Sequence, residues 1–201
     1  MAYSGAMREP TVPRAASPAL RRYVDLLLRW NRAVNLVGAR DIPNLWQRHI
    51  ADSLQLAELW RHRPERAIDL GSGAGFPGLV LAIACNVPFD LVEQDQGKAA
   101  FLREAARVTG APVNVVAANI ETAALPPAPL VTARALAPLP RLLRFAAPLL
   151  LPGGDCLFLK GRDVDSEIFE AGKHWTMDIE QIPSRVAGDG VVLRVTNLKR
   201  P

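Results

Sequence analysis

The feature that most constrains this chain is a regular alternation of short apolar runs and longer amphipathic segments after residue 66. Strand-length runs that alternate with helix-length segments build βαβ units, whose strands lie parallel in one sheet. We therefore expect an α/β fold with a largely parallel sheet. The expected strands are residues 67–70, 89–93, 113–118, 130–134 and 155–160, and the expected helices are residues 76–86, 97–109, 139–149 and 164–172.

The C-terminal part of the chain follows a different pattern. Two strand-like runs, Thr176–Ile182 and Gly190–Leu198, are separated by a glycine-containing turn sequence at residues 187–190. Strands joined by such a short turn pair antiparallel. We expect this pair at one edge of the sheet.

The N-terminal third predicts a helical extension. Residues 1–16 show no periodicity and are expected to form a flexible leader. Ser17 followed by Pro18 is a typical helix start, with serine as the N-cap and proline at the first helical position. A second helix is expected from about Pro43 to Trp60. The chain thus divides into a leader, an extension over 17–65 and a main domain over 66–201.

Charge and composition exclude several classes of protein. The net charge is +4, but residues 1–66 alone carry 11 arginines and 6 acidic residues. Such a local excess of arginine suits a polyanion such as RNA, and it equally suits the exposed face of an ordinary helical segment. The apolar stretches are too short to span a membrane, there is no signal-peptide pattern, and the two cysteines have no metal-ligand spacing. We expect a cytoplasmic protein without a metal.

The densest local signal is the glycine-rich sequence AIDLGSGAGFPG at residues 67–78. A predicted strand runs into Gly71, Gly73 and Gly75, and a predicted helix follows. Glycines allow the backbone to turn sharply and to approach a ligand closely, and the N-terminus of the helix offers N–H groups to an anionic part of that ligand. A tight connection that binds nothing is the alternative.

The spacing of the glycines separates two ligand classes. Dinucleotide sites prefer G-x-G-x-x-G, but here the third glycine position is Phe76. The observed G-x-G-x-G, with Asp69 two residues earlier and Ser72 within the turn, suits S-adenosylmethionine, which has no pyrophosphate to bind.

The ends of the next two strands carry further candidates. Glu93 lies 22 residues after Gly71 and can accept hydrogen bonds from ribose hydroxyls, in a methyl donor or in a nicotinamide cofactor alike. At the end of the third strand, Ile120 can pack on an adenine ring and Glu121 can meet its edge. The alternatives are an exposed acid at a strand end for Glu93 and a helix-start acid for Glu121.

Further motifs follow one another along most of the chain from about residue 20. They are Leu28-Arg29-Trp30-Asn31, Asn35-Leu36-Val37, Arg48-His49-Ile50, Asp52-Ser53-Leu54, Lys98, Phe101–Glu104, Arg134-Ala135, Pro152–Gly154 and Leu159–Gly161. Together with the glycine turn, this ordered set resembles the bacterial small-subunit ribosomal RNA guanine-N7 methyltransferases, also called glucose-inhibited division protein B.

The resemblance implies a class I S-adenosylmethionine-dependent methyltransferase, with a seven-stranded Rossmann-like sheet and a small N-terminal helical extension. It implies methylation of N7 of a guanine in the decoding-region loop of 16S ribosomal RNA, either in the free RNA or in the small ribosomal subunit. Separately from the resemblance, we expect a monomer. Carried over by position, the donor contacts are Gly71, Phe76, Ile120, Glu121 and Arg134. Many members of this family have arginine where this chain has Asn119.

Transfer of a methyl group to guanine N7 requires alignment and no general base, because N7 has a lone pair and no proton to lose. Arg134 follows the fourth strand and is a candidate catalytic residue that holds guanine O6, a phosphate or the donor; Lys160 is a candidate for a catalytic or RNA-phosphate contact. Arg29 and His49 are candidate RNA contacts. For His49, a packed structural histidine is the alternative.

Two other functions stay open on the sequence. A nicotinamide-dependent reductase fits the acid at Glu93, but Phe76 in place of the third glycine and the missing Tyr-x-x-x-Lys pair argue against it. A noncatalytic RNA-binding protein with a retained donor pocket is the other alternative, because catalysis by alignment demands few particular side chains.

Overall fold

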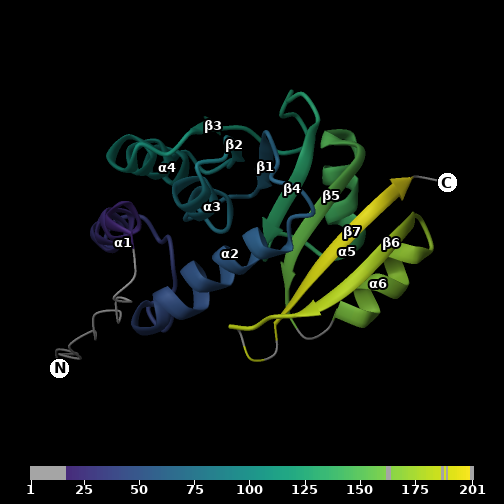
Figure 1. Ribbon diagram of the computed structural model, residues 1–201. Coiled ribbons are helices and arrows are strands. Elements are labelled where there is room, and N and C mark those ends of the chain that lie inside the picture. Colours follow the sequence, from purple (N-terminus) through teal and green to yellow (C-terminus); the bar gives the residue numbers. More distant parts are fainter. Residues whose placement is uncertain (1–16, 162–163, 187, 189, 200–201) are drawn as a thin grey trace.

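The computed structural model describes residues 17–161, 164–186, 188 and 190–199. Its centre is one seven-stranded sheet with the strand order β3-β2-β1-β4-β5-β7-β6 (Figure 1). The strands are β1 (Ala67–Leu70), β2 (Phe89–Val92), β3 (Val113–Val116), β4 (Ala128–Arg134), β5 (Leu150–Lys160), β6 (Thr176–Pro183) and β7 (Val191–Lys199). The expected α/β fold is therefore confirmed.

Pairing within the sheet changes direction only at one edge. Strands β3, β2, β1, β4 and β5 are parallel, whereas β7 pairs antiparallel with both β5 and β6. The expected antiparallel pair at the end of the chain is confirmed, although Ala187 and Asp189 of the predicted turn lie outside the described residues. Strand β5 begins at Leu150, earlier than the expected start at residue 155, with a register irregularity against β4.

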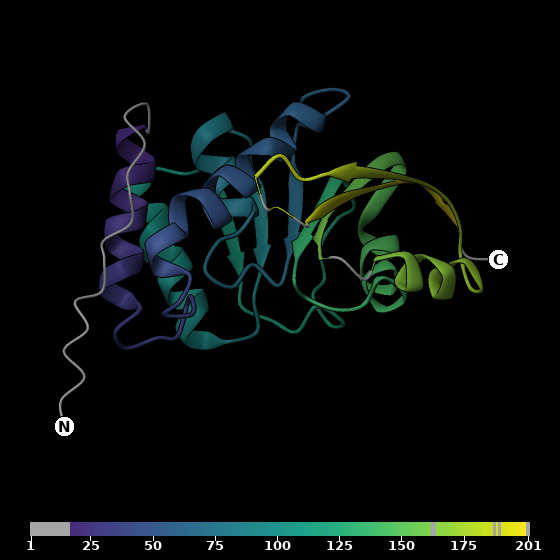
Figure 2. The same cartoon turned by 90° about the horizontal axis from the view of Figure 1, so that it is seen from below.

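Helices cover both faces of the sheet (Figures 1 and 2). One face carries α1 (Pro18–Trp30), α3 (Gly78–Cys85), α4 (Gln96–Thr109) and the helical segment that contains α2, and the other face carries α5 (Leu139–Ala146), the short turn Ala147–Leu149 and α6 (Val164–Gly172). Each face has its own buried cluster, so the sheet is apolar on both sides as parallel sheets generally are. No helix among these described residues is long and apolar enough to cross a membrane.

Ser17 caps the start of helix α1, and Asn31 organises the loop that follows its end. Ser17 Oγ accepts a hydrogen bond from Leu20 N–H at 3.2 Å. At the other end, Asn31 Oδ1 accepts from Leu36 N–H at 2.8 Å and from Val37 N–H at 2.9 Å, which turns the chain back on itself. The face between these caps buries Tyr23 and Leu27 completely. The predicted leader, residues 1–16, lies outside the described residues.

The second expected helix is helical but irregular. Instead of one α-helix from Pro43 to Trp60, it consists of 3-10 turns at Ile42–Asn44 and Gln55–Leu59, a π-helical stretch at Trp46–Ala51 and α2 (Asp52–Leu54). Ser53 Oγ donates to His49 O at 2.6 Å within the wide turn. Such side-chain bonds to the preceding turn compete with the regular helical ladder, and π-bulges are frequent at functional sites.

The contact between α3 and β1 is close because of one glycine. A Cβ placed on Gly78 would lie 2.5 Å from Asp69 Cβ and 2.7 Å from Leu91 Cδ2. In dinucleotide-binding folds the third glycine of the motif allows this helix–strand approach. Here Gly78 has that packing role, while Phe76 occupies the usual third position.

This contact predicts the effect of Gly78→Ala. The added methyl group must displace the backbone of α3 from β1, so we expect the free energy of unfolding in urea to fall by about 1–3 kcal/mol. Gly172→Ala is the matched control, because a Cβ there meets nothing within 4 Å. Equal unfolding free energies for Gly78→Ala and the wild type would show that the helix is not held this tightly.

Candidate active site

The glycine turn forms the floor of a cavity. Gly71, Gly73 and Gly75 have positive φ angles of 66°, 55° and 102°. A Cβ on Gly75 would lie 2.9 Å from Leu79 Cβ, so packing requires a glycine there, whereas a Cβ on Gly71 would meet the end of the Leu136 side chain, at 2.6 Å from Cδ1. A Cβ on Gly73 would meet only Gly71 O, at 3.8 Å. Gly73 therefore faces open space.

That space is a cavity of about 340 Å³ at the carboxyl ends of β1, β2 and β4. The volume falls in the range of roughly 300–1,000 Å³ typical of ligand pockets, and open α/β sheets bind ligands at this edge where the strand order reverses. The cavity is lined by Gly71, Gly73, Val92, Glu93, Gln94, Lys98, Asn119, Ile120, Arg134, Ala135, Leu136, Ala137, Arg141 and Phe145.

Glu93 is buried and bonded on both carboxylate oxygens. Oε2 accepts from Gly73 N–H at 2.8 Å, and Oε1 accepts from Asp95 N–H at 2.8 Å. These bonds fix the carboxylate against the glycine turn and leave further acceptor capacity on each oxygen. The structure therefore brings Glu93 to the cavity in a fixed orientation, not as an exposed acid at a strand end.

The turn after β3 contributes one of its two predicted residues to the cavity wall. Ile120 lines the cavity, whereas the Glu121 side chain is 58% exposed and lies 3.7 Å from Arg141 at the rim. Asn119 Oδ1 accepts from Glu121 N–H at 2.9 Å and so closes this turn. Asparagine thus has a local structural role at position 119.

The N-terminus of α3 does not serve the cavity as expected. The N–H groups of Gly75 and Phe76 both donate to Ser72 O, and those of Leu79 and Val80 donate to Gly75 O. The described residues that line the cavity include none from α3. The expectation of free helix N–H groups facing a ligand is wrong, because the loop folds into an extra turn that uses them.

Asp69 and Ser72 lie beneath the turn instead of on the cavity wall. Asp69 is fully buried and accepts from Thr132 Oγ1 at 2.7 Å, and burial raises the pKa of its carboxyl to about 6. Ser72 Oγ donates to Asp69 O at 3.2 Å. The structure gives these two predicted residues a supporting position: Asp69 links the end of β1 to β4, and Ser72 closes the turn after β1.

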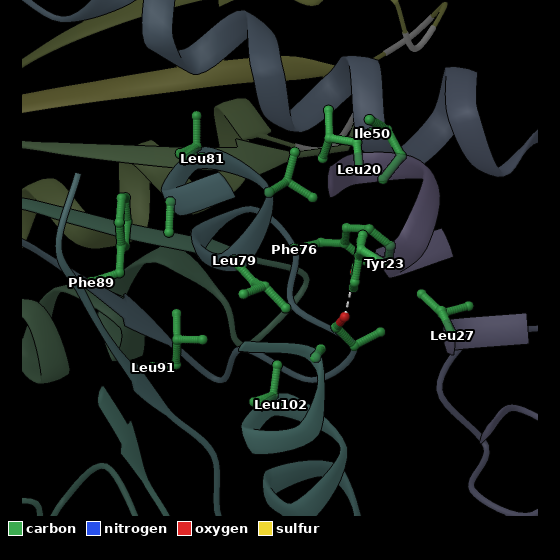
Figure 3. Close-up of a cluster of buried hydrophobic side chains, with 14 of the residues drawn as sticks. Leu20, Tyr23, Leu27, Ile50, Phe76, Leu79, Leu81, Phe89, Leu91 and Leu102 are labelled. Carbon is green, nitrogen blue, oxygen red and sulfur yellow. Dashed lines mark hydrogen bonds between the residues drawn. The ribbon is translucent and has the colours of Figure 1, made fainter. Parts of the chain in front are cut away.

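Phe76 is buried behind the turn, in a stack of side chains that the sequence did not reveal. Its ring lies parallel to the His49 ring, at 4.9 Å between centroids and 17° between planes, and Arg134 Cζ lies 5.1 Å from its centroid. Tyr23 meets Phe76 edge-on at 6.0 Å and donates from its hydroxyl to Ala74 O at 2.5 Å (Figure 3). Helix α1 thus holds the glycine turn from outside the sheet.

Arg134 connects this stack to the cavity. Its side chain is 20% exposed, and burial lowers the pKa of the guanidinium below its ordinary value. Nη1 donates to Arg48 O at 3.1 Å and lies 3.7 Å from Asp52 Oδ2, while Nη2 is hydrogen-bonded to His49 Nδ1. Arginine stays protonated in proteins, so a fixed cation stands at the cavity wall.

His49 is neutral in this arrangement. Burial, and then the charge of Arg134, lower the pKa of the imidazole to about 4. Nδ1 accepts from Arg134, so the proton of the neutral ring is on Nε2, a buried atom without a hydrogen-bond partner in the described part of the chain. The ring is 7% exposed, which fits the packed histidine better than a direct RNA contact.

Two other predicted residues lie away from the cavity lining. Lys160 Nζ pairs with Glu167 at 2.6 Å and donates to Ala137 O at 3.0 Å, so it holds the cavity wall from behind. Arg29 is exposed on α1. The pKa of Glu104 on α4 is lowered by its hydrogen bond with Arg107 and, to a smaller extent, by the charges of Arg107 and Arg29. Among the described residues, no group of three or more His, Cys, Asp or Glu side chains is arranged to hold a metal ion.

Comparison with known proteins connects this geometry to a family. The family model described as rRNA small subunit methyltransferase G matches residues 16–189. The chain belongs to this family of rRNA methyltransferases. The resemblance that the sequence motifs suggested is therefore confirmed.

Curated relatives agree over nearly the whole chain. A protein from Gluconobacter oxydans, named ribosomal RNA small subunit methyltransferase G, is 53% identical, with 94% of this chain and 98% of that protein covered. A protein of the same name from Paramagnetospirillum magneticum is 49% identical, with 94% of this chain and 92% of that protein covered.

Solved structures support the fold. A putative O-methyltransferase from Klebsiella pneumoniae matches with a TM-score of 0.58 and 17% identity, over 92% of each chain. The glycopeptide N-methyltransferase MtfA complexed with S-adenosylmethionine matches with a TM-score of 0.61 and 13% identity, over 74% of this chain and 93% of that one. At such identities these matches establish the methyltransferase fold, and function has to be argued from the site.

The depressed pKa of His49 predicts how stability depends on pH. Between pH 6.5 and about 4 the unfolded chain binds a proton at His49 that the folded chain does not, so this residue lowers stability as pH falls through that window. His49→Gln removes the titrating group and keeps an acceptor for Arg134. We expect its unfolding free energy in urea to fall less than that of the wild type between pH 7 and pH 5.

The control for this measurement is His62→Gln, because His62 is exposed. That variant should keep the pH dependence of the wild type. If His49→Gln loses as much stability as the wild type over the same interval, His49 is not buried in its neutral form.

Proposed function

We propose that this chain transfers the methyl group of S-adenosylmethionine to N7 of a guanine in the decoding-region loop of 16S ribosomal RNA. The observation that carries the proposal is the cavity above Gly73, bounded by Glu93, Ile120 and Arg134, in a chain of this rRNA methyltransferase family. The residues fit the donor, because Gly73, the glycine of the turn with open space above it, lies between a fixed acid on one side and a fixed cation on the other.

The proposed donor contacts follow the order of the strands. Glu93 accepts from the ribose hydroxyls, Ile120 packs on the adenine with Glu121 near its edge, and the turn around Gly71 and Gly73 supports the amino-acid end. Arg134 meets an anionic or carbonyl oxygen at the reacting end of the cavity, from the donor's carboxylate or from the RNA. When bound, S-adenosylmethionine supplies a methyl group on a sulfonium, which is already activated for displacement.

The side chains of the site suit a reaction that depends on alignment. His49 is neutral and donates no proton to the cavity, and Arg134 keeps its proton. Guanine N7 has no proton to lose, so the chain needs only to orient the base and exclude water. Asp69, Ser72, Gly75 and Phe76 are proposed to shape the turn that holds the donor.

We further infer the setting of this reaction. The substrate is 16S ribosomal RNA, free or within the small ribosomal subunit, and a ribosomal substrate makes the cytoplasm the expected compartment. Residues 66–201 form the methyltransferase domain, and residues 17–65 form an extension of it. The protein acts as a monomer. Lys160 and Arg29 remain candidate contacts for RNA phosphates. For Lys160, this contact requires that its ammonium group leaves Glu167 and pairs with a phosphate.

The reaction is tested in cells with and without the gene. Ribosomal RNA is treated with borohydride and aniline, which cleaves at N7-methylguanine, and primer extension maps the cleavage. We expect a stop in the decoding-region loop that disappears with the gene and returns with the wild-type chain but not with Arg134→Ala. A stop that persists without the gene would contradict the assigned reaction and favour a noncatalytic RNA-binding protein.

Ligand binding separates the donor from a nicotinamide cofactor. Calorimetry of the purified chain should detect S-adenosylhomocysteine and should not detect NADH. Gly73→Val fills the open space above the turn, so we expect its affinity for S-adenosylhomocysteine to fall by more than about 100-fold. Binding of NADH alone would favour the reductase.

The control for Gly73→Val is Gly110→Val. Gly110 also has a positive φ, 72°, and a Cβ there meets nothing within 4 Å. Both variants therefore strain the backbone in the same region of φ, by about 1–2 kcal/mol, but only the first fills the cavity. Equal loss of binding in the two variants would mean that general destabilisation, not the cavity, explains the effect.

A further inference from the structure

The side chains that hold Arg134 come from segments outside the strands of the central parallel sheet. His49 and the carbonyl of Arg48 belong to the π-helical stretch Trp46–Ala51, and Asp52 begins α2. Together they contact both terminal nitrogens of the guanidinium. The orientation of Arg134 therefore depends on the N-terminal segment.

Asp52 is itself fixed by neighbours from the far end of the chain. Its Oδ1 accepts from Gln55 Nε2 at 2.6 Å and from Ser184 Oγ at 3.1 Å, which leaves Oδ2 facing Arg134. Gln55 Oε1 accepts from Arg185 N–H at 3.1 Å. The segment after β6 and the segment around α2 thus hold this carboxylate between them.

An aromatic ring also restricts the guanidinium. Arg134 Cζ lies over the Phe76 ring, and the His49 ring stacks on that same phenyl group. Phe76 is packed in turn by Tyr23 from α1. The side chain of Arg134 is therefore restricted by hydrogen bonds, by charge and by an aromatic ring. These contacts come from outside the strands of the parallel sheet.

We propose that Asp52 and His49 are positioning residues for the methyl-transfer reaction, acting through Arg134. His49 is hydrogen-bonded to one terminal nitrogen of the guanidinium. Asp52 balances its charge from 3.7 Å beside the other nitrogen, which donates to Arg48 O, so that Arg134 meets its oxygen partner at the cavity wall in one orientation. This inference rests on the proposed function. Displacement of about 1 Å in such an aligned site reduces rates by about 100-fold.

The charge is as important as the geometry. Asp52→Asn has the same shape and keeps hydrogen-bonding capacity toward Gln55 and Ser184, so it removes mainly the negative charge beside Arg134. We expect kcat for guanine-N7 methylation to fall about 10- to 100-fold, while the Kd for S-adenosylhomocysteine changes less than about 3-fold. A loss of donor affinity as large as the loss of kcat would overturn the proposed role in alignment.

The matched control is Asp90→Asn. Asp90 is 8% exposed, compared with 7% for Asp52, and it pairs with Arg66 and accepts from Asn114 Nδ2 at 2.8 Å, but it does not contact Arg134. Its variant should lose stability without a comparable loss of kcat. If both variants reduce kcat equally, Asp52 acts through general stability, and the proposal fails.

A double-mutant cycle tests whether Asp52 and His49 act through Arg134. Arg134→Lys keeps a positive charge but removes the planar fork that His49 and Asp52 contact. We expect Asp52→Asn to reduce single-turnover rates strongly in the wild-type chain and by less than about 2-fold in the Arg134→Lys chain. Equal losses in both backgrounds would overturn the proposal, and so would full activity of Arg134→Lys.

His49→Leu, which removes the hydrogen-bond acceptor for Arg134, keeps the proposal testable if Asp52→Asn does not fold, as judged by its thermal unfolding. This variant should show the same split between kcat and donor Kd and the same dependence on Arg134. Failure of the proposed function can be distinguished from failure of the positioning role, because in the first case the wild-type chain itself does not methylate guanine N7. If the wild-type chain is active and the Asp52→Asn and His49→Leu variants are fully active too, only the positioning role is overturned.

Discussion

The site depends on how the glycine turn is held from the side that faces away from the cavity. The turn inserts Phe76 between Tyr23, His49 and Arg134, and Ala74 O accepts a hydrogen bond from the Tyr23 hydroxyl. A loop with several glycines has many conformations available, and this packing selects one of them. The cavity is open above Gly73 because the other side of the turn is filled by side chains from α1 and the second helical segment.

Much of the fold was accessible from local patterns. Strand–helix alternation predicted the order and type of the elements, because the spacing of apolar residues and the length of each segment depend only on residues close together in the sequence. The cavity residues Gly71, Gly73, Glu93, Ile120 and Arg134 were also found, because parallel strands bring their carboxyl ends to one edge. A residue that directly follows a strand can therefore be predicted as a cavity residue even when its distant contacts are unknown.

The parts that sequence reasoning missed depend on contacts between distant positions. The spacing of apolar residues in α1 does not predict that Tyr23 donates a hydrogen bond to the glycine turn. A tyrosine on a buried helical face did indicate, however, that its hydroxyl needs a partner. Gly78 was visible in the motif, but its closeness to Asp69 is a property of two packed elements. The link from Asp52 to Ser184 joins opposite ends of the chain and leaves no mark in either local pattern.

The same contacts explain why this site uses a neutral histidine and a buried ion pair. A proton-transfer enzyme needs a group whose pKa is near the working pH, but burial and Arg134 keep the His49 ring neutral well below pH 7. A neutral imidazole can accept from a guanidinium at every pH near neutrality, and an adjacent carboxylate compensates the buried charge. A neutral His49 and a protonated Arg134 suit a reaction that needs no proton transfer and only requires two reactants to meet in a fixed orientation.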